Sequence, residues 1–311
     1  MPMQPYLAML SRCIMCPRQC AIDRLSGKKG FCGAGDSPRV AHYGPHFGEE
    51  PPITGSKGSG NIFFSHCNLR CIFCQNHQIS HDGTGELLSV EGLISIFFSL
   101  RSQGCHNINL VSPTPYVPFI APAIDEARRR GFDLPFVYNT NAYDSVEALK
   151  ELEGLIDIYL PDLKYSSGAI ASRLSLASDK APYPEAARAA ILEMKRQVGD
   201  MVVEGGIAKK GLIVRHLVLP GGLAGSRQVF DWIGEKLGTS TFIGLMSQYF
   251  PAHRSGDYPI LARRIRQDEY DNVVAYLVER GFENVFVQEL ESAPLFVPDF
   301  SKDKPFVGNS G

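Results

Sequence analysis

Short apolar segments alternate with longer amphipathic segments from Gly60 to about residue 290, and this alternation constrains the fold more than any other feature. The expected strands are residues 61–64, 107–111, 134–138, 156–160, 212–219 and 241–246. The expected helices are residues 90–102, 117–130, a short one near 146, 184–198, 227–237 and 268–280. Strands that alternate with helices form right-handed βαβ units and a parallel sheet. Six such units fit either a partial (β/α)6 TIM-like barrel or a doubly wound sheet.

The composition excludes several classes of protein. Hydrophobic residues make up 44% and charged residues 21% of the 311 residues, which is typical of a globular chain and not of a disordered or fibrous one. The formal net charge of −2 shows no basic excess that would attract nucleic acid or an anionic membrane, so we expect neither as a partner. The first residues contain no basic segment followed by an apolar one, and we therefore expect a cytoplasmic protein.

Three cysteines with the spacing C-x3-C-x2-C follow the first expected strand: Cys67, Cys71 and Cys74. Three thiolates on one loop can bind three irons of a [4Fe–4S] cluster, and the fourth iron then stays open to a small chelating molecule. The alternative is a zinc site with a histidine as its fourth ligand, for which the candidates are His66, His77 and His81.

A second group of cysteines lies in residues 1–58, a region rich in glycine and proline that we expect to be a loop-rich metal-binding module. Its thiols are Cys13, Cys16, Cys20 and Cys32. Four thiolates fit either a structural zinc ion or a second, fully ligated iron–sulfur cluster, and the spacing does not decide between them. Residues 59–291 are the expected catalytic core, and residues 292–311 an extended tail.

Polar residues follow several expected strands, at the edge of a parallel barrel where active sites form. They are Asn139 and Asn141, Asp162 and Lys164, Arg215 and Gln248. The alternative for each is a buried polar group that is satisfied by its neighbours. The short loop between the two cysteine groups contains His42, His46, Glu49 and Glu50, which either line the mouth of the site or face solvent.

The Cys67–Cys74 motif, with Phe73 before its third cysteine, resembles that of the radical S-adenosylmethionine (SAM) superfamily. Within it the chain looks most like pyruvate formate-lyase activating enzyme-like proteins, from about residue 12 to residue 290. The stretches that carry this likeness are Cys16-Pro-Arg-Gln-Cys20, Gly30-Phe-Cys32-Gly-Ala, Phe47-Gly-Glu-Glu-Pro-Pro, Gly58-Ser-Gly60, Cys74-Gln-Asn76, Pro161-Asp-Leu-Lys164, Met194-Lys-Arg-Gln-Val-Gly-Asp200, Arg215-His-Leu-Val-Leu-Pro220 and Met246-Ser-Gln-Tyr249.

The resemblance implies an oxidoreductase that binds a [4Fe–4S] cluster and SAM. It implies reductive cleavage of SAM to a 5′-deoxyadenosyl radical, and hydrogen abstraction from a glycine of a partner protein, a glycyl radical enzyme. The implied electron donor is a flavodoxin or ferredoxin. Two alternatives stay open: the radical modifies a small molecule or peptide, or the chain binds metal without SAM chemistry.

The resemblance also implies roles for individual residues. Asp162 and Lys164 are the implied catalytic residues. The implied cofactor-binding residues are Phe73, Ser112, Thr114, Asn139, Asn141, Arg215 and Gln248. This sequence departs from the family at two places. Asn139 stands where the activating enzymes have an aspartate. The segment Ser112-Pro113-Thr114-Pro115 stands where a Gly-Gly-Glu-like segment usually binds the SAM amino group, so Ser112 or Thr114 would have to accept its hydrogen bonds.

Overall fold

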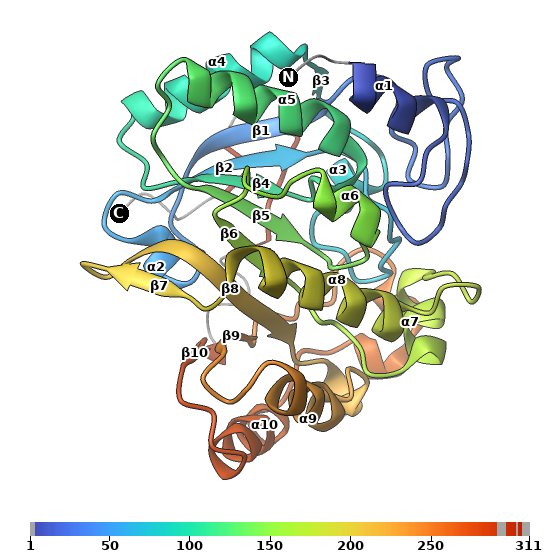
Figure 1. The fold of residues 1–311 in the computed structure, drawn as a ribbon. Coiled ribbons are helices and arrows are strands. Elements are labelled where there is room, and N and C mark those ends of the chain that lie inside the picture. The colour runs from blue at the N-terminus through green and yellow to red at the C-terminus, as the bar shows by residue number, and fades with distance from the viewer. Residues whose placement is uncertain (1–3, 291–296, 303, 307–311) are drawn as a thin grey trace.

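The computed structural model describes residues 4–290, 297–302 and 304–306, and its centre is a twisted ten-stranded sheet (Figure 1). The strands are β1 (Arg39–His46), β2 (Ser59–Phe64), β3 (Glu86–Leu87), β4 (Ile108–Val111), β5 (Phe136–Thr140), β6 (Ile158–Pro161), β7 (Val202–Glu204), β8 (Ile207–Leu217), β9 (Phe242–Met246) and β10 (Val285–Val287). Every residue of β2, β5 and β6 is buried, as expected for strands covered on both faces.

The order of the strands decides between the two expected architectures. Strands β2, β4, β5, β6, β8, β9 and β10 are parallel neighbours in the order of the sequence. A doubly wound sheet would reverse its direction at its centre, whereas a barrel adds each new strand on the same side. The sheet is not closed, and the expected α/β partial barrel is therefore confirmed.

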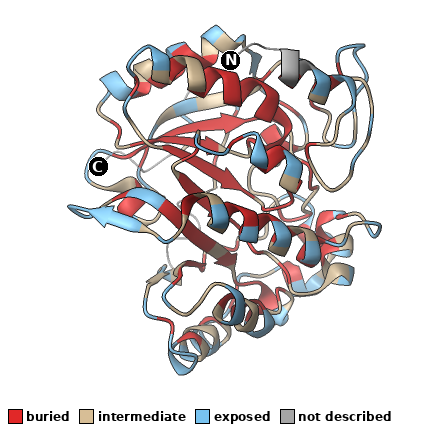
Figure 2. Cartoon of the chain, viewed as in Figure 1, coloured by how far each residue is buried: buried red, intermediate tan, exposed pale blue. Residues whose placement is uncertain are grey.

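Helices cover the outer face of the curved sheet and turn their buried sides towards it (Figure 2). The α-helices of the described residues are α1 (Gln4–Ser11), α2 (Pro51–Thr54), α3 (His77–Ser80), α4 (Val90–Ser102), α5 (Val117–Arg129), α6 (Val146–Lys150), α7 (Gly168–Ser175), α8 (Tyr183–Val198), α9 (Ser226–Lys236) and α10 (Gln267–Glu279). Local signals set several of their starts. Ser89 caps α4 by accepting a hydrogen bond from the Gly92 amide at 3.0 Å, and Ser145 and Ser167 cap α6 and α7 in the same way.

Residues 39–46 form strand β1, although the sequence predicted only loops there. This strand pairs antiparallel with β2, so that Tyr43 lies opposite Ile62. Gly44 and Pro45 are both disfavoured inside strands, so the sequence does not predict one here. Buried and exposed side chains also do not alternate regularly along it. Strands β7 and β10 and helices α1 and α7 were also not predicted. The N-terminal region therefore contributes one strand to the main sheet.

The described part of the C-terminal tail returns to the sheet. Phe300 packs against Phe63 of β2 at 5.6 Å between ring centroids, and Phe306 contacts both Phe63 and His46. Residues 292–296, which the sequence places at the start of an extended tail, lie outside the described residues.

Candidate active site

The three central thiols lie on the loop between β2 and α3, at the carboxyl ends of the parallel strands. Each is close to a polar side chain from a different element. Asn141 Nδ2 donates to Cys67 Sγ at 3.2 Å, Ser175 Oγ donates to Cys71 Sγ at 3.0 Å, and Ser80 Oγ lies 3.2 Å from Cys74 Sγ. Backbone hydrogen bonds from Arg70 and Ile72 to the end of α7 fix the loop. The thiols are thus held by the fold itself.

The donor set fits a cluster better than a single zinc ion. Over the ranges that the structure describes, no three His, Cys, Asp or Glu side chains come together as ligands of one metal ion. Among the histidines that the zinc alternative requires, His77 and His81 both pack against His253, and His66 packs under Gly83. In a [4Fe–4S] cluster each cysteine binds a different iron, so the ligands stand further apart. Cys67, Cys71 and Cys74 therefore fit a cluster with one open iron.

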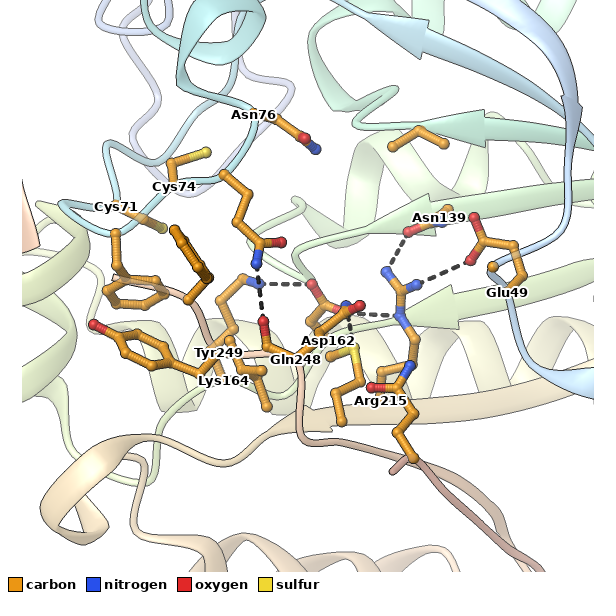
Figure 3. A pocket seen from close by; sticks show the side chains of 18 of the residues that line it. Glu49, Cys71, Cys74, Asn76, Asn139, Asp162, Lys164, Arg215, Gln248 and Tyr249 are labelled. Carbon is orange, nitrogen blue, oxygen red and sulfur yellow. Dashed lines mark hydrogen bonds and ion pairs between the residues drawn. The ribbon is translucent and has the colours of Figure 1, made fainter. Parts of the chain in front are cut away.

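Cys71 and Cys74 line one wall of a cavity of about 220 Å³ inside the open barrel (Figure 3). The opposite side carries a charged network. Asp162 Oδ2 is 2.6 Å from Lys164 Nζ, and Asp162 Oδ1 is 2.8 Å from Arg215 Nε. Arg215 Nη2 also donates to Asn139 Oδ1 at 2.5 Å. The strand ends thus place two cations and one shared carboxylate in the same cavity as the thiols.

Asp162 and Lys164 of this network stay charged at neutral pH. Burial disfavours the charged form of Asp162, but the attraction of Arg215 and Lys164 outweighs it and lowers the pKa of the carboxyl. Burial likewise acts against the ammonium of Lys164, but the nearby Asp162 and Cys71 leave the pKa of Lys164 raised. Lys164 is therefore a fixed cation close to Cys71, where it can bind an anionic group of a ligand.

Glu49 and Glu50 also line this cavity, and Figure 3 shows Glu49 on the side away from Cys71 and Cys74. Glu49 Oε2 is 3.3 Å from Arg215 Nη1, and its Oε1 accepts from Asn61 Nδ2 at 2.7 Å. Glu50 lies against Gly244 of β9, and its buried Oε2 has no hydrogen-bond partner among the described residues. Burial raises the pKa of Glu50 to about 7. The solvent-facing alternative for these two residues is therefore wrong.

A second cavity, of about 470 Å³, lies on the other side of the same two glutamates, between residues 47–51 and strands β9 and β10. Glu49, Glu50, Met246 and Gln288 border both cavities. The two cavities are therefore neighbours that share the glutamate pair.

The structure brings most of the predicted residues together. Those that line the first cavity are Phe73, Asn139, Asp162, Lys164, Arg215 and Gln248. Asn141 stands behind the cysteine loop and contacts Cys67, as described above. Ser112 does not line this cavity, and Thr114 lines a different one. Their role as SAM ligands stays a prediction.

Several lining residues were not singled out as site residues from the sequence. Gln75 and Asn76 follow the third cysteine directly, and their place beside Cys74 was the available signal. Phe306 gave no such signal, because the C-terminal tail reaches the cavity only through tertiary packing, whereas His46 was a candidate for the mouth of the site and does line the cavity.

The N-terminal cysteines also lie together. Cys13, Cys16, Cys20 and Cys32 all line one small enclosed cavity, and all four thiols are free. Thr114, Pro115 and Asn68 contribute to its wall.

Comparisons with known proteins found one family model and related sequences. Residues 61–196 match the family model described as the radical SAM superfamily. An uncharacterized protein, MJ0674 of Methanocaldococcus jannaschii, is 27% identical over 274 residues, which cover 84% of this chain and 73% of that protein.

Among solved structures, a radical SAM methyltransferase from Sphaerobacter thermophilus has a TM-score of 0.49 and 15% identity, over 75% of this chain and 68% of its own. The [FeFe]-hydrogenase maturase HydG of Carboxydothermus hydrogenoformans has a TM-score of 0.49 and 14% identity, over 73% of this chain and 53% of its own. This chain thus spans about half of the maturase. Over the described residues, no helix is both long and apolar enough to cross a membrane.

Proposed function

We propose that this chain, whose residues 61–196 belong to the radical SAM superfamily, binds a [4Fe–4S] cluster on Cys67, Cys71 and Cys74 and SAM in the adjoining cavity. When bound, the cluster and SAM supply reductive cleavage of the SAM sulfonium, which yields a 5′-deoxyadenosyl radical that abstracts a hydrogen atom from the substrate. One observation carries the proposal: Cys71 and Cys74 of the three-cysteine loop line the same cavity as the Asp162–Lys164–Arg215 network.

The residues of the chain bind and orient the cofactor in this proposal. Lys164 offers a cation to a carboxylate, and Asp162 fixes the positions of both Lys164 and Arg215. Phe73 packs edge-on against Tyr249 at 5.6 Å and closes one side of the cavity to water. Gln75 Nε2 donates to the backbone carbonyl of Gln248 at 2.9 Å and ties the cysteine loop to the end of β9. Such fixed polar groups act best where water is excluded.

We further propose that the hydrogen comes from a glycine of a partner protein, so that the chain activates a glycyl radical enzyme. The activating role is supported by the sequence stretches that resemble those of activating enzymes, above all Pro161-Asp-Leu-Lys164 and Arg215-His-Leu-Val-Leu-Pro220. A flavodoxin or ferredoxin is the proposed electron donor.

A second candidate is a small-molecule substrate, and the shape of the cavity favours it. Glu49 and Glu50 line one end of the cavity, and Phe306 of the C-terminal tail lines the cavity too. Glu50 Oε2 is buried and has no hydrogen-bond partner among the described residues. It could therefore accept a hydrogen bond from a donor group of a small substrate.

The test is anaerobic reconstitution with iron and sulfide, reduction with dithionite, and addition of SAM. The expected products are 5′-deoxyadenosine and methionine. Lys164→Ala should slow their release without loss of iron, because Lys164 is not a cluster ligand. If fully loaded, reduced protein binds SAM and releases no 5′-deoxyadenosine with any donor, the proposal fails and a metal-binding protein without SAM chemistry takes its place.

Two further measurements separate the candidates. A glycyl radical EPR signal in an added partner protein supports the activating role. A low-molecular-weight extract from cells that accelerates the release of 5′-deoxyadenosine supports the small-molecule role, provided that the protein fraction of the same cells does not accelerate it.

A further inference from the structure

The second cavity, between residues 47–51 and strands β9 and β10, has a carboxylate and an aromatic ring on its wall. Gly244 of β9 is the register partner of Phe286 of β10, and register partners in a parallel pair face the same side of the sheet. A Cβ at Gly244 would lie 2.3 Å from Glu50 Oε1, so this glycine makes room for the carboxylate. Glu50 and Phe286 both line the cavity, and its volume of about 470 Å³ is typical of a small-molecule site.

Glu50 forms no salt bridge among the described residues, although two cations lie in the same region. Lys164 and Arg215 are both held by Asp162, at 2.6 and 2.8 Å. Arg215 also pairs with Glu49 at 3.3 Å. Burial raises the pKa of Glu50 to about 7 against the attraction of Arg215. The three carboxylates thus outnumber the two cations, and a further cation beside Glu50 would balance the buried charge.

The rest of the second cavity also favours a cation. Among the described residues that line it, Glu289 is a third carboxylate, and none is a lysine, an arginine or a histidine. Apolar surface comes from Phe47, Val285 and Val287, and Phe47 is itself exposed. An aromatic ring attracts a cation placed over its face, and a carboxylate accepts strong hydrogen bonds from it. The cavity is therefore suited to a cationic group on an apolar body.

SAM also carries cationic groups, but its proposed position is elsewhere. SAM is proposed to bind beside the active-site cysteines, and none of them lines the second cavity. Figure 3 shows Glu49 on the side away from Cys71 and Cys74. Glu50 follows Glu49 in the sequence and lines both cavities. The second cavity thus offers a cation site apart from the proposed position of SAM.

We propose that the second cavity binds the protonated amine or amidine of a small molecule beside Glu50, with the apolar body of that molecule against Phe286 and Phe47. We further infer that this molecule is the substrate, because Glu50 and Met246 border both this cavity and the one beside the active-site thiols. The substrate assignment rests on the small-molecule form of the proposed function, whereas the binding site does not.

The first arm of the test compares three probes that differ in charge: phenethylamine, which is a cation, phenethyl alcohol, which is neutral, and phenylacetate, which is an anion. Calorimetry on the iron-loaded chain at pH 8, without SAM or reductant, measures their affinities. The amine should bind about tenfold more tightly than the alcohol, because a charge-assisted hydrogen bond is stronger than a neutral one, and phenylacetate should bind most weakly. Equal affinities of the amine and the alcohol, or no binding of the amine at millimolar concentration, would overturn the proposal. The amine should still bind in the presence of saturating SAM, and loss of its binding would assign the cation position to SAM instead.

Proton release is a second signature of an amine beside Glu50. Because the pKa of Glu50 is about 7, the amine should displace roughly 0.9 proton per chain at pH 6 and about 0.1 at pH 8. Titrations in two buffers with different ionisation enthalpies measure these numbers. Arg215, Glu49 and Asp162 act on the same carboxyl, and burial lowers the pKa of His46 in the first cavity. Release from any of these groups would persist in Glu50→Gln, whereas release from Glu50 should vanish, and persistence would overturn the assignment.

Three variants locate the probes. Glu50→Gln keeps the shape of the side chain and should reduce the preference for the amine over the alcohol to less than about twofold. Glu204→Gln is the matched control, because it removes an exposed carboxylate of β7 outside both cavities and should keep the preference. Phe47 lines the second cavity and not the first, so Phe47→Ala should weaken the binding of all three probes. An unchanged preference in Glu50→Gln, or unchanged affinities in Phe47→Ala, would place the probes elsewhere and overturn the proposal.

The substrate assignment has its own test, in the loaded and reduced chain with SAM. The fraction of a low-molecular-weight cell extract that accelerates the release of 5′-deoxyadenosine should be retained by a cation exchanger at pH 7. A stimulating fraction that passes through the exchanger would overturn the assignment. If no fraction stimulates release although phenethylamine binds as expected, the small-molecule form of the proposed function and the substrate assignment both fail, and the cation site stands.

Discussion

Replacement of Glu50 by glutamine should change how the stability of the protein depends on pH. Burial raises the pKa of this carboxyl from 4.5 to about 7. An acid whose pKa is raised in the folded state binds more protons when folded, so its contribution to stability falls as the pH rises. Both states are protonated well below pH 4.5, and the full cost of a buried charge is present above pH 7.

The size of the effect follows from those two pKa values. Between pH 5 and pH 8 the free energy of unfolding of the unaltered chain should fall by roughly 2.5 kcal/mol relative to that of Glu50→Gln. The assay is urea unfolding of both proteins, loaded with equal iron, at several pH values. Comparison of the two proteins cancels the contribution of titrating groups that are distant from position 50. A difference that stays constant from pH 5 to pH 8, or that grows in the opposite direction, would refute the argument, and an infrared titration of the protonated carboxyl provides an independent check.

Three other substitutions probe the same cavity. Arg215→Ala leaves the buried Glu49 carboxylate without its ion pair and should lower the free energy of unfolding by about 3 kcal/mol, with a smaller loss for Arg215→Lys. Gly244→Ala places a Cβ 2.3 Å from Glu50 Oε1 and should cost about 1–3 kcal/mol by urea unfolding, a cost that Glu50→Ala in the same chain should remove. Lys164→Met keeps the side-chain length but not the charge, so calorimetry should show weaker SAM binding at unchanged iron content; unchanged affinity would contradict the assigned role.

The helical and parallel parts of the fold were accessible from the sequence because their signals are local. Helix α4 begins at Val90 as predicted, since Ser89 caps it and apolar residues recur along one face. Strand β1 was missed because its pairing with β2 is tertiary, and Gly44 and Pro45 weaken its own propensity.

The same division applies to the candidate site. Asp162, Lys164 and Arg215 were accessible because polar residues at the ends of parallel strands meet at one edge. The deep placement of Glu50 was not, because only the absence of a side chain at Gly244 makes room for it, and the two residues lie far apart in the sequence. Thr114 follows β4 at the same edge of the sheet but lines the cavity of the N-terminal cysteines, and its hydroxyl lies 3.4 Å from that of Thr140.

The side chains beside the three active-site sulfurs have an electronic consequence. Asn141, Ser175 and Ser80 each approach one ligand sulfur at 3.0–3.2 Å. Donors to cluster sulfurs stabilise the more negative, reduced form and so shift the reduction potential upwards. A cluster with these hydrogen bonds is easier for a mild donor to reduce, but the reduced cluster is then a weaker reductant towards a sulfonium. These three contacts therefore raise the reduction potential of the cluster. Ser175→Ala would remove one of them and leave a cluster that is harder to reduce but is a stronger reductant once reduced.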